Sequence, residues 1–378
     1  TNDHLDRTCR RIHGARLLRD SAIGWRVVTS PRYRWQPTTK EIAARFGLRP
    51  DDVVRFDHNT SPFTTDWAPG IVGPMARQLN EYPGASYADL RHAAASHHGV
   101  NVDEIVPGAG ADEMILLIAK AFLGEGKRAC AAVPTYPLYE IATLQSGAEF
   151  RTVDLDWPNL GLPTEDLTDA AETADVTWLC VPNNPTGHRF ADPALRHIVA
   201  RAKGLVVIDA AYAEFAGDRW GEWVSAHDNL IVLHTMSKAF GLAALRVGFA
   251  LSHPSIADRL DGVRPPGSIA SMSADLAQEA LASPQRMERN VAMILSERER
   301  LSAELAQLPV GVVPDSNTNF LLCEIGPSAP HLAAALMEEG LVVRQFPEAH
   351  PLHEFLRFTV RSRLEDDRLL DALRRRLS

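Results

Sequence analysis

The stretch Leu205-Val206-Val207-Ile208-Asp209 decides the fold, because it places four consecutive apolar residues directly before a carboxylate. Similar short apolar runs recur along the middle of the chain, with helical segments between them, at 129–133, 176–181, 230–234 and 246–251. Strands that are apolar on both faces belong in a sheet that helices cover on both sides. The sequence therefore predicts an α/β fold with a mostly parallel central sheet.

The last third of the chain follows a different pattern. The chain has 378 residues, which is long enough for two packed domains. From residue 271 to about 308 the pattern is helical, and candidate strands follow at 320–324, 341–346 and 355–360, before a closing helix from Leu364. This order predicts a second, smaller α+β domain.

The N-terminal region resembles neither part. Residues 1–37 are rich in arginine and show no clear period, so we interpret them as an arm or lid. The residues from Thr38 to Phe46, closed by Gly47, have the pattern of a capped amphipathic helix. We therefore divide the chain into an N-terminal arm with part of the small domain (1–60), a large domain (61–271) and a C-terminal small domain (272–378).

Charge and hydropathy argue against several classes of partner. The chain has 39 basic and 48 acidic residues and a formal net charge of -9, which disfavours nucleic acid and anionic membrane surfaces as partners. Its apolar runs fall far short of the roughly 20 residues needed to span a bilayer. The N-terminus lacks the apolar centre of a secretory signal, so we expect a cytoplasmic protein.

The sequence gives no indication of a metal site. The four cysteines lie far apart, without a Cys-x-x-Cys pair: Cys9, Cys130, Cys180 and Cys323. We expect them to be buried, unpaired thiols. The adjacent pair His97-His98 is interpreted as a solvated helix end and not as a metal pair, because neighbouring helical residues point in different directions.

One of the five lysines has unusual surroundings. Lys238 follows the apolar run 231–233 and is flanked by small, hydroxyl and aromatic residues, with no carboxylate nearby in the sequence. A lysine in such a site loses solvation, which lowers its pKa and allows the amine to attack a carbonyl group at neutral pH. Eight residues further on, Arg246 offers a permanent positive charge for an anion.

Three polar side chains follow the ends of candidate strands. Asp209 ends its strand where doubly wound sheets bind ligands, and a carboxylate there can keep a ring nitrogen protonated. Asn184 follows another strand as an amide donor, and Tyr136 follows a third and could lie flat against a planar ring. Alone, each has a structural interpretation as a helix cap, an Asn-Pro turn or a core tyrosine. Together they favour a cofactor of the pyridoxal type.

A glycine-rich turn adds a candidate anion site. Gly108-Ala109-Gly110-Ala111-Asp112 leads directly into an apolar helical run, so its backbone N–H groups would point outward at a helix N-terminus. The turn lacks the third glycine of a dinucleotide fingerprint. A plain capped helix remains the alternative for this turn taken alone.

These motifs carry a family resemblance. Asn184-Pro185-Thr186-Gly187, Asp209-x-x-Tyr212 and Ser237-Lys238-x7-Arg246-x-Gly248 resemble, in order and spacing, the signature of fold-type-I pyridoxal-phosphate aminotransferases of class I/II. Within that group the chain is most similar to histidinol-phosphate aminotransferases, through 110–113, 181–187, 235–242 and 356–360. The resemblance runs from about Ala44 to the C-terminus and implies that the large domain, 61–271, binds pyridoxal 5'-phosphate.

The resemblance also implies a role for each residue at the cofactor. Lys238 would form the Schiff base and move the proton at the substrate Cα, and Asp209 would pair with the ring nitrogen. Tyr136 would stack on the ring, while Asn184 and Tyr212 would bind its 3'-oxygen. The phosphate would lie among Gly110, Ala111, Asp112, Thr235, Ser237 and Arg246.

Further residues concern the substrate and the partner subunit. Arg357, with Asn184, resembles the group that grips the substrate carboxylate in a two-pronged bond. Arg344 falls where relatives that bind a phosphorylated side chain carry an arginine, and a solvated strand-end arginine is the alternative. Tyr82 matches a tyrosine that reaches the partner subunit's phosphate, which implies a homodimer with shared active sites.

Three departures from the family pattern affect the expected substrate, and the first is that residues 1–37 have no clear counterpart in the family. Ser61 replaces the second asparagine of the usual Asn-x-Asn-Pro, and Arg361 replaces the glycine that usually follows Leu-Arg-x-Thr-Val. The leading hypothesis is an aminotransferase that acts on an L-amino acid or histidinol phosphate and a 2-oxo acid. The alternatives are a pyridoxal-phosphate decarboxylase of the threonine-phosphate type or a cyclase, and a non-catalytic regulatory module that binds the cofactor.

Overall fold

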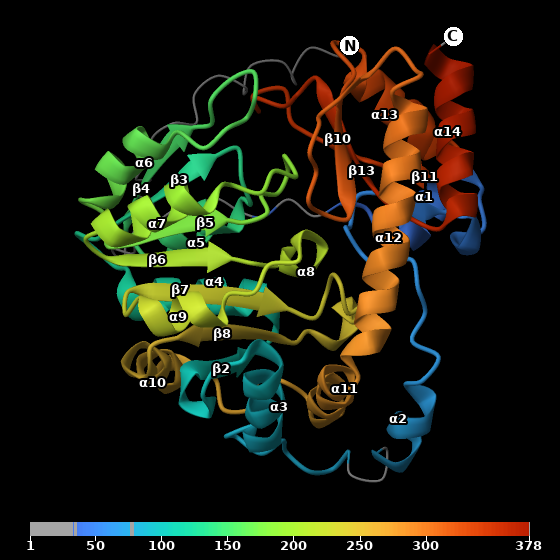
Figure 1. Ribbon diagram of the computed structural model, residues 1–378. Coiled ribbons are helices and arrows are strands. Elements are labelled where there is room, and N and C mark those ends of the chain that lie inside the picture. Colours follow the sequence, from blue (N-terminus) through green and yellow to red (C-terminus); the bar gives the residue numbers. More distant parts are fainter. Residues whose placement is uncertain (1–32, 34–35, 76–78, 378) are drawn as a thin grey trace, which may run out of the picture.

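The computed structural model describes residues 33, 36–75 and 79–377 of the chain. They form a large and a small domain (Figure 1). A cavity lined by residues of both domains lies between them. Most of the predicted N-terminal arm, together with Cys9, lies outside the described residues. In the described part of the chain, none of the helices has the length and apolar character required to cross a membrane.

The large domain is built on a seven-stranded sheet with the order β2-β8-β7-β6-β5-β3-β4. The strands are β2 (Ile105–Gly108), β3 (Arg128–Val133), β4 (Glu149–Asp154), β5 (Val176–Cys180), β6 (Leu205–Asp209), β7 (Leu230–Thr235) and β8 (Gly248–Ser252). Adjacent strands are parallel except at β8, which runs antiparallel to both of its neighbours. The predicted α/β fold with a mostly parallel sheet is confirmed.

Two strands of this sheet escaped the sequence analysis. β2 has only four residues and includes Pro107, and β4 at the sheet edge is mostly polar and exposed. The predicted strand at 246–251 starts two residues late, because Arg246 has a left-handed backbone (φ 52°) that cannot continue a strand. An apolar-run criterion detects the buried central strands and misses short or half-exposed ones.

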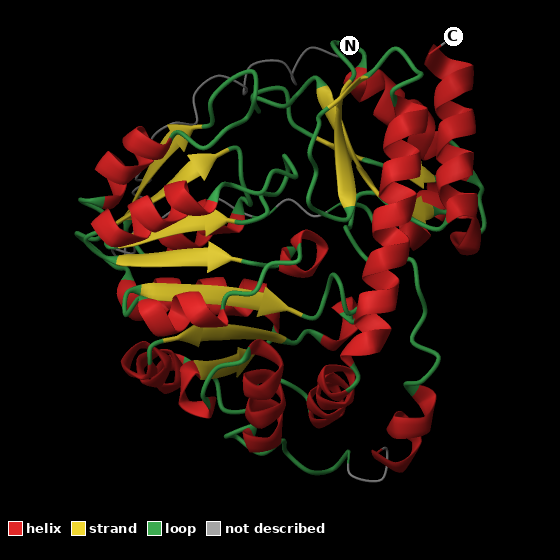
Figure 2. Ribbon diagram, in the orientation of Figure 1, coloured by secondary structure: helices red, strands yellow, loops and turns green. Residues whose placement is uncertain are grey.

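Helices cover both faces of the sheet (Figure 2). One face packs against α4 (Gly110–Phe122), α5 (Leu138–Gln145) and α10 (Pro254–Val263). The other face packs against α3 (Ala88–His98), α6 (Thr164–Ala171), α7 (Asp192–Arg201), α8 (Ala213–Ala216), α9 (Gly221–Ala226) and α11 (Ser271–Ala282). Alternate strand residues supply the two cores: Val207 and Ile231 face the first group, and Val206 and Ile208 face the second.

The small domain contains an antiparallel sheet of the order β12-β13-β10-β9 and a short parallel pair, β1 with β11. Its strands are β1 (Val54–Arg55), β9 (Gly311–Val312), β10 (Phe320–Glu324), β11 (Leu341–Val342), β12 (Arg344–Gln345) and β13 (Phe355–Thr359). Its helices are α1 (Thr39–Phe46), α12 (Pro284–Leu305), α13 (Ala329–Glu338) and α14 (Arg363–Leu377), and α2 (Pro69–Met75) lies in the connection to the large domain. The small domain also contains the short 3-10 turn η1 (Pro50–Asp52), and the large domain contains η3 (Val102–Glu104) and η4 (Ala243–Leu245).

Several local predictions can be compared with these elements. The helix from Thr38 to Gly47 is confirmed: Thr38 and Glu41 form a capping box, and Gly47 closes the helix with φ 68°. The long helical stretch after 271 is divided at Ser283 and Pro284 into α11 and α12. The strand predicted at 341–346 is two short strands, so the sequence located the extended segment but missed the interruption at Val343.

Candidate active site

A cavity of about 690 Å³ opens at the carboxyl ends of the parallel strands, where the small domain faces the large one. The large domain contributes Ala111, Asp112, Tyr136, Asn184, Asp209, Tyr212, Thr235, Ser237, Lys238 and Arg246 to its lining. The small domain contributes Arg344 and Arg357. The fold thus brings together every predicted site residue except Gly110, which lies directly behind the wall, and Tyr82.

Lys238 follows β7 and points into the cavity. Its Nζ donates a hydrogen bond to the His58 carbonyl oxygen (3.3 Å) and lies 5.9 Å from the centre of the Tyr212 ring. Burial, followed by the positive charge of Arg357, lowers the pKa of the Lys238 amine to about 8. The desolvated, nucleophilic lysine expected from the sequence is therefore present.

Asp209 ends β6 in a buried position on the wall of the cavity. Its carboxylate accepts hydrogen bonds from the Tyr139 hydroxyl (2.7 Å) and from the Ala211 N–H (3.1 Å), both of which are neutral donors. Burial raises the pKa of Asp209 to about 6, against an ordinary value of 3.8. A carboxylate in these surroundings is suited to a cationic partner such as a protonated ring nitrogen.

Sequence reasoning missed Tyr139, because it lies on α5 at a position that looks like ordinary helix core. The side chain is buried and its ring stacks on Trp178, with 5.3 Å between ring centres and 5° between planes. This packing fixes the direction of the hydroxyl group toward Asp209. Only the tertiary contact with β6 distinguishes Tyr139 from a structural tyrosine.

The N-terminus of α4 and the loops after β7 form a cup of donors. Arg246 contacts the Asp112 carboxylate (3.0 Å) and donates to the Ser237 hydroxyl (3.3 Å), which in turn lies 3.0 Å from the Thr235 hydroxyl. Gly110 has φ 83°, and a Cβ there would lie only 2.7 Å from the Arg246 guanidinium. A helix N-terminus, hydroxyl groups and an arginine together suit a phosphate group.

Tyr136 lies on the wall beside this cup. Its hydroxyl donates to the second Asp112 oxygen (2.9 Å), and its ring meets Tyr139 edge to face at 5.8 Å. Burial, reinforced by the negative charge of Asp112, raises the pKa of the Tyr136 hydroxyl, which therefore remains a neutral donor. Its predicted stacking on a cofactor ring remains a prediction.

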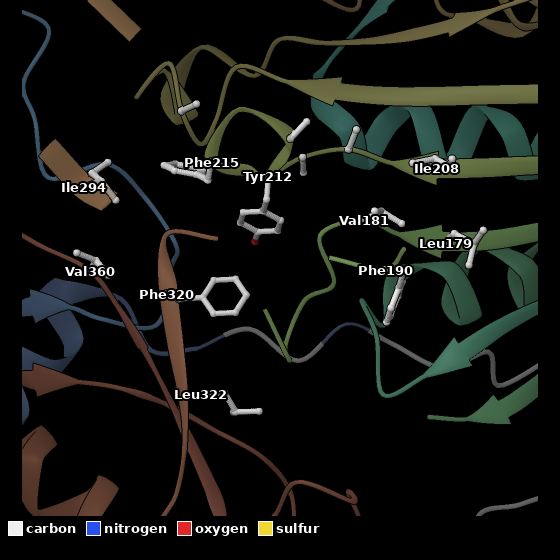
Figure 3. Close-up of a cluster of buried hydrophobic side chains, with 14 of the residues drawn as sticks. Leu179, Val181, Phe190, Ile208, Tyr212, Phe215, Ile294, Phe320, Leu322 and Val360 are labelled. Atoms are coloured by element: carbon white, nitrogen blue, oxygen red, sulfur yellow. The ribbon is translucent and has the colours of Figure 1, made fainter. Parts of the chain in front are cut away.

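Tyr212 reaches the boundary between the domains (Figure 3). Its ring meets that of Phe320 from β10 edge to face, with 5.4 Å between centres, and its hydroxyl accepts a hydrogen bond from Asn59 (2.8 Å). Asn59 is nearly fully buried and belongs to the segment that connects β1 to the large domain. Asn59 is the first asparagine of the Asn-x-Asn-Pro position, of which the sequence analysis considered only Ser61, and the structure shows that Asn59 contacts a site residue.

Arg357 enters the cavity from β13 of the small domain. Its guanidinium donates to the Asn184 side-chain oxygen (2.5 Å) and to the Asp57 carbonyl oxygen (2.8 Å), and lies 4.9 Å from the centre of the Phe320 ring. Burial lowers the pKa of Arg357 to about 10, so it keeps its charge at neutral pH. Arg344 is the direct strand partner of Arg357, which places both side chains on the same face of the sheet.

The comparisons with known proteins agree with this geometry. Residues 57–375 match the family model described as aminotransferase class I and II. The chain belongs to the class I and II aminotransferase family. It is a pyridoxal-phosphate-dependent aminotransferase of fold type I, as the sequence resemblance implied.

Several relatives of this aminotransferase are histidinol-phosphate aminotransferases. The chain is 32% identical over 345 residues to a histidinol-phosphate aminotransferase of Methanothermobacter thermautotrophicus, covering 88% of this chain and 91% of the relative. It is 35% identical to one from Caldanaerobacter subterraneus, covering 86% and 93%. The crystal structure of histidinol-phosphate aminotransferase from Sinorhizobium meliloti in complex with pyridoxal 5'-phosphate superposes with a TM-score of 0.82 at 25% identity, covering 90% of this chain and 94% of that one.

Two predictions differ from the structure of this aminotransferase: the surroundings of the pair His97-His98, and the place of Tyr82 relative to the cavity. His97 and His98 end α3, as expected, but they are half-buried and not fully solvated: the His98 ring lies 4.1 Å from that of His234 on β7, and burial lowers the pKa of both histidines of the pair. The end of α3 packs against the sheet, which the local sequence does not reveal. Tyr82 is 96% exposed and does not line the cavity. The three described cysteines are buried and unpaired, as expected.

Proposed function

We propose that this aminotransferase transfers an amino group between an amine that carries a further anionic group, such as the phosphate of histidinol phosphate, and a 2-oxo acid. The observation that carries the proposal is the charge arrangement of the cavity. Lys238 and the buried carboxylate of Asp209 lie on the large-domain side, while Arg357 and Arg344 enter from the small domain. Such an arrangement suits a reacting amine at one end and acidic groups at the other.

The large domain supplies the residues for the chemistry. Pyridoxal phosphate, when bound, provides an aldehyde for the amine and a ring that withdraws electrons from the substrate Cα. Lys238 would attach the cofactor and carry the proton to and from Cα, a role that suits an amine with a pKa of about 8. Asp209, held by Tyr139, would keep the ring nitrogen protonated. The cup around Gly110, Ala111, Asp112, Thr235, Ser237 and Arg246 would hold the phosphate.

The small domain supplies the residues for substrate orientation. Arg357, positioned by its hydrogen bonds to Asn184 and to the Asp57 carbonyl, would bind the carboxylate of the 2-oxo acid. An oriented carboxylate fixes which substrate bond stands perpendicular to the cofactor ring, and this orientation selects proton loss.

His350, like Arg344, lines the cavity and supplies a second donor. The His350 Nδ1 accepts a backbone hydrogen bond from Leu352 (3.1 Å), which leaves its proton on Nε2. Burial and the charge of Arg344 hold the pKa of His350 at about 4, so its ring is neutral at physiological pH. Arg344 and His350 together support an anionic substrate end at this position.

We also propose a cytoplasmic homodimer with shared active sites and the domain division at residues 60 and 271. Tyr82 and Leu79 are strongly exposed on a loop outside the cavity, and apolar side chains of this size are typical of contacts with another protein surface. Tyr82 would reach the partner subunit's phosphate. The unpaired thiols of Cys130, Cys180 and Cys323 fit a reducing compartment.

The test is a half-reaction without an acceptor. Cofactor-loaded protein is mixed with histidinol phosphate and with a panel of L-amino acids, and the carbonyl product and CO2 are measured. We expect carbonyl product without CO2, and the largest yield from histidinol phosphate. The variant Lys238→Ala should form none, while Lys40→Ala on the exposed side of α1 should match the wild type.

Other results would refute parts of the proposal. Release of CO2 would favour a decarboxylase of the threonine-phosphate type, and a cyclised product would favour a cyclase. Absence of any product with every amine would favour a regulatory module. Equal yields from phosphorylated and unphosphorylated amines would remove Arg344 from substrate recognition.

A further inference from the structure

Arg361 follows β13 and lies outside the cavity, at the junction of the small domain with the segment 57–61. We propose that Arg361 is a positioning residue for the catalytic lysine: it clamps the backbone of Thr60 and Ser61, so that the preceding residues of the segment stay in contact with Lys238 and Tyr212. The inference rests on the proposed role of Lys238, and it concerns a residue that takes no part in substrate or cofactor contact.

The contacts of the guanidinium are directed at backbone. Nη1 of Arg361 lies 3.3 Å from the Thr60 carbonyl oxygen and 3.4 Å from the Ser61 carbonyl oxygen. Nη2 pairs with the Glu365 carboxylate (3.3 Å), and the side chain is only 15% exposed. The Nη2 side of the guanidinium thus faces the carboxylate on α14, while Nη1 contacts two successive carbonyl groups. A lysine would have to meet all three acceptors with one nitrogen, so it can replace the planar guanidinium only in part.

Arg361 is itself firmly placed. Its backbone N–H donates to both oxygens of the Asp366 carboxylate, at 3.1 and 3.2 Å, and Asp366 is fully buried in the first turns of α14. Ser362 and Glu365 form reciprocal bonds that begin the same helix. The guanidinium therefore extends from a rigid helix start, which makes it a fixed anchor for the segment opposite.

The clamped segment contacts the catalytic groups directly. The carbonyl oxygen of His58 accepts the hydrogen bond from Lys238, and the Asn59 amide donates to Tyr212. Asn59 has φ 54°, in the left-handed region that non-glycine residues rarely adopt, so its conformation requires restraint from its neighbours. Thr359 supplies one restraint through the Asn59 side chain (3.0 Å), and Arg361 restrains the next residues along the chain.

A second contact connects the segment to the lysine loop. A Cβ on Gly241 would lie 3.3 Å from the Ser61 Cβ, so the two backbones are closely packed at this point. The Gly241 N–H donates to the Lys238 carbonyl oxygen (3.1 Å), and Gly241 has φ 70°. The lysine loop is therefore held by the segment at the side chain of Lys238 and at Gly241, and a loosened segment would affect both.

The experiment compares Arg361→Gln, Arg361→Lys and the control Arg363→Gln, which changes an exposed arginine two residues away. Hydrogen–deuterium exchange is measured at the backbone amides of 58–61 in cofactor-free protein. We expect Arg361→Gln to accelerate this exchange at least about tenfold, Arg361→Lys to accelerate it less, and the control to leave it unchanged.

The second readout is the reactivity of Lys238 toward pyridoxal phosphate as a function of pH, in the same proteins. Loss of the His58 carbonyl acceptor removes a contact that stabilises the ammonium form, so the pH midpoint of attachment should move down in Arg361→Gln and be partly restored in Arg361→Lys. With loaded enzyme, kcat should fall more than KM rises, because the lysine acts in the proton transfer.

The two possible failures are distinguishable. If exchange at 58–61 and the pH midpoint both stay at wild-type values while only the melting temperature falls, Arg361 is structural and the inference is wrong. If they change as expected but the loaded wild type transfers no amino group, the positioning role holds and the proposed function fails.

Discussion

Asp209 is expected to lower the stability of the folded protein at neutral pH and, at the same time, to be required for its activity. Its carboxylate is fully buried, and its pKa is raised from 3.8 to about 6 in the folded chain. Because the raised pKa favours the protonated form, the group's contribution to folding is fully present below about pH 4 and is lost as the pH rises through about 6. A shift of about two pKa units corresponds to about 3 kcal/mol in the free energy of unfolding. Cofactor-free protein is therefore less stable by about this amount at neutral pH than it is near pH 4, as far as Asp209 is concerned.

The perturbation is Asp209→Asn. The asparagine has nearly the same volume, its side-chain oxygen can still accept from the Ala211 N–H, and its amide can donate to Tyr139 in place of accepting from it. We expect cofactor-free Asp209→Asn protein to be more stable than wild type by about 2 to 3 kcal/mol near pH 7.5 and by less than about 1 kcal/mol near pH 4. Turnover should fall by orders of magnitude, because a neutral amide cannot hold the ring nitrogen protonated.

The assay is urea unfolding of cofactor-free protein, followed by tryptophan fluorescence at both pH values. Trp178 stacks on Tyr139 and therefore reports on the surroundings of Asp209. Asp258→Asn, on the exposed face of α10, serves as the control and should change stability little at either pH. The assigned cost of burying the carboxylate would be refuted if Asp209→Asn increased the free energy of unfolding equally at the two pH values, or did not increase it near pH 7.5. Either result would show that burial of the ionised carboxylate does not destabilise the folded chain.

The same geometry makes three further predictions. Attachment of pyridoxal phosphate to Lys238 should accelerate about tenfold per pH unit and level off near pH 8, where its amine becomes neutral, and a flat profile would contradict the lowered pKa. Arg357→Lys should raise the barrier measured by kcat/KM by roughly 2 to 4 kcal/mol, and an unchanged value would remove this arginine from the substrate site. Gly248→Ala would place a Cβ 2.7 Å from the Gly110 carbonyl carbon, so it should cost about 1 to 3 kcal/mol of stability and weaken phosphate binding. The control Gly262→Ala, which meets nothing within 4 Å, should be neutral or slightly stabilising, and equal effects of the two changes would count against the close approach.

The contrast between Lys238 and Tyr139 shows how far local sequence reaches. Lys238 is recognisable because its neighbours are apolar, small or hydroxyl residues, and the pKa of a buried amine follows from such surroundings. Tyr139 has equally apolar neighbours, yet its contact with Asp209 spans 70 residues of sequence. No local pattern encodes which core tyrosine will meet which strand end.

The small-domain contacts make the same point. The motif around Arg357 indicated a carboxylate-binding arginine, but its partners Asn184 and Asp57 lie 173 and 300 residues away. The partial burial of His98 was not foreseen for the same reason, since the sheet residues that it contacts, His234 and Phe249, lie more than 130 positions later. The polarity of the two histidines suggested that they face solvent, whereas in the folded chain His98 lies against β7 and β8.

By itself, the sequence determined the strand-and-helix alternation, the class of fold and the set of side chains predicted to bind the cofactor, because each depends on residue type and spacing along a few consecutive positions. Tertiary structure decided which of these side chains share a cavity, which arginine faces which amide, and how Arg361 holds the segment beside the lysine. Those relations depend on strand order and on the packing of two domains, where residues hundreds of positions apart become neighbours. The sequence thus specifies which chemical groups are present, and the folded chain determines the distances and directions between them.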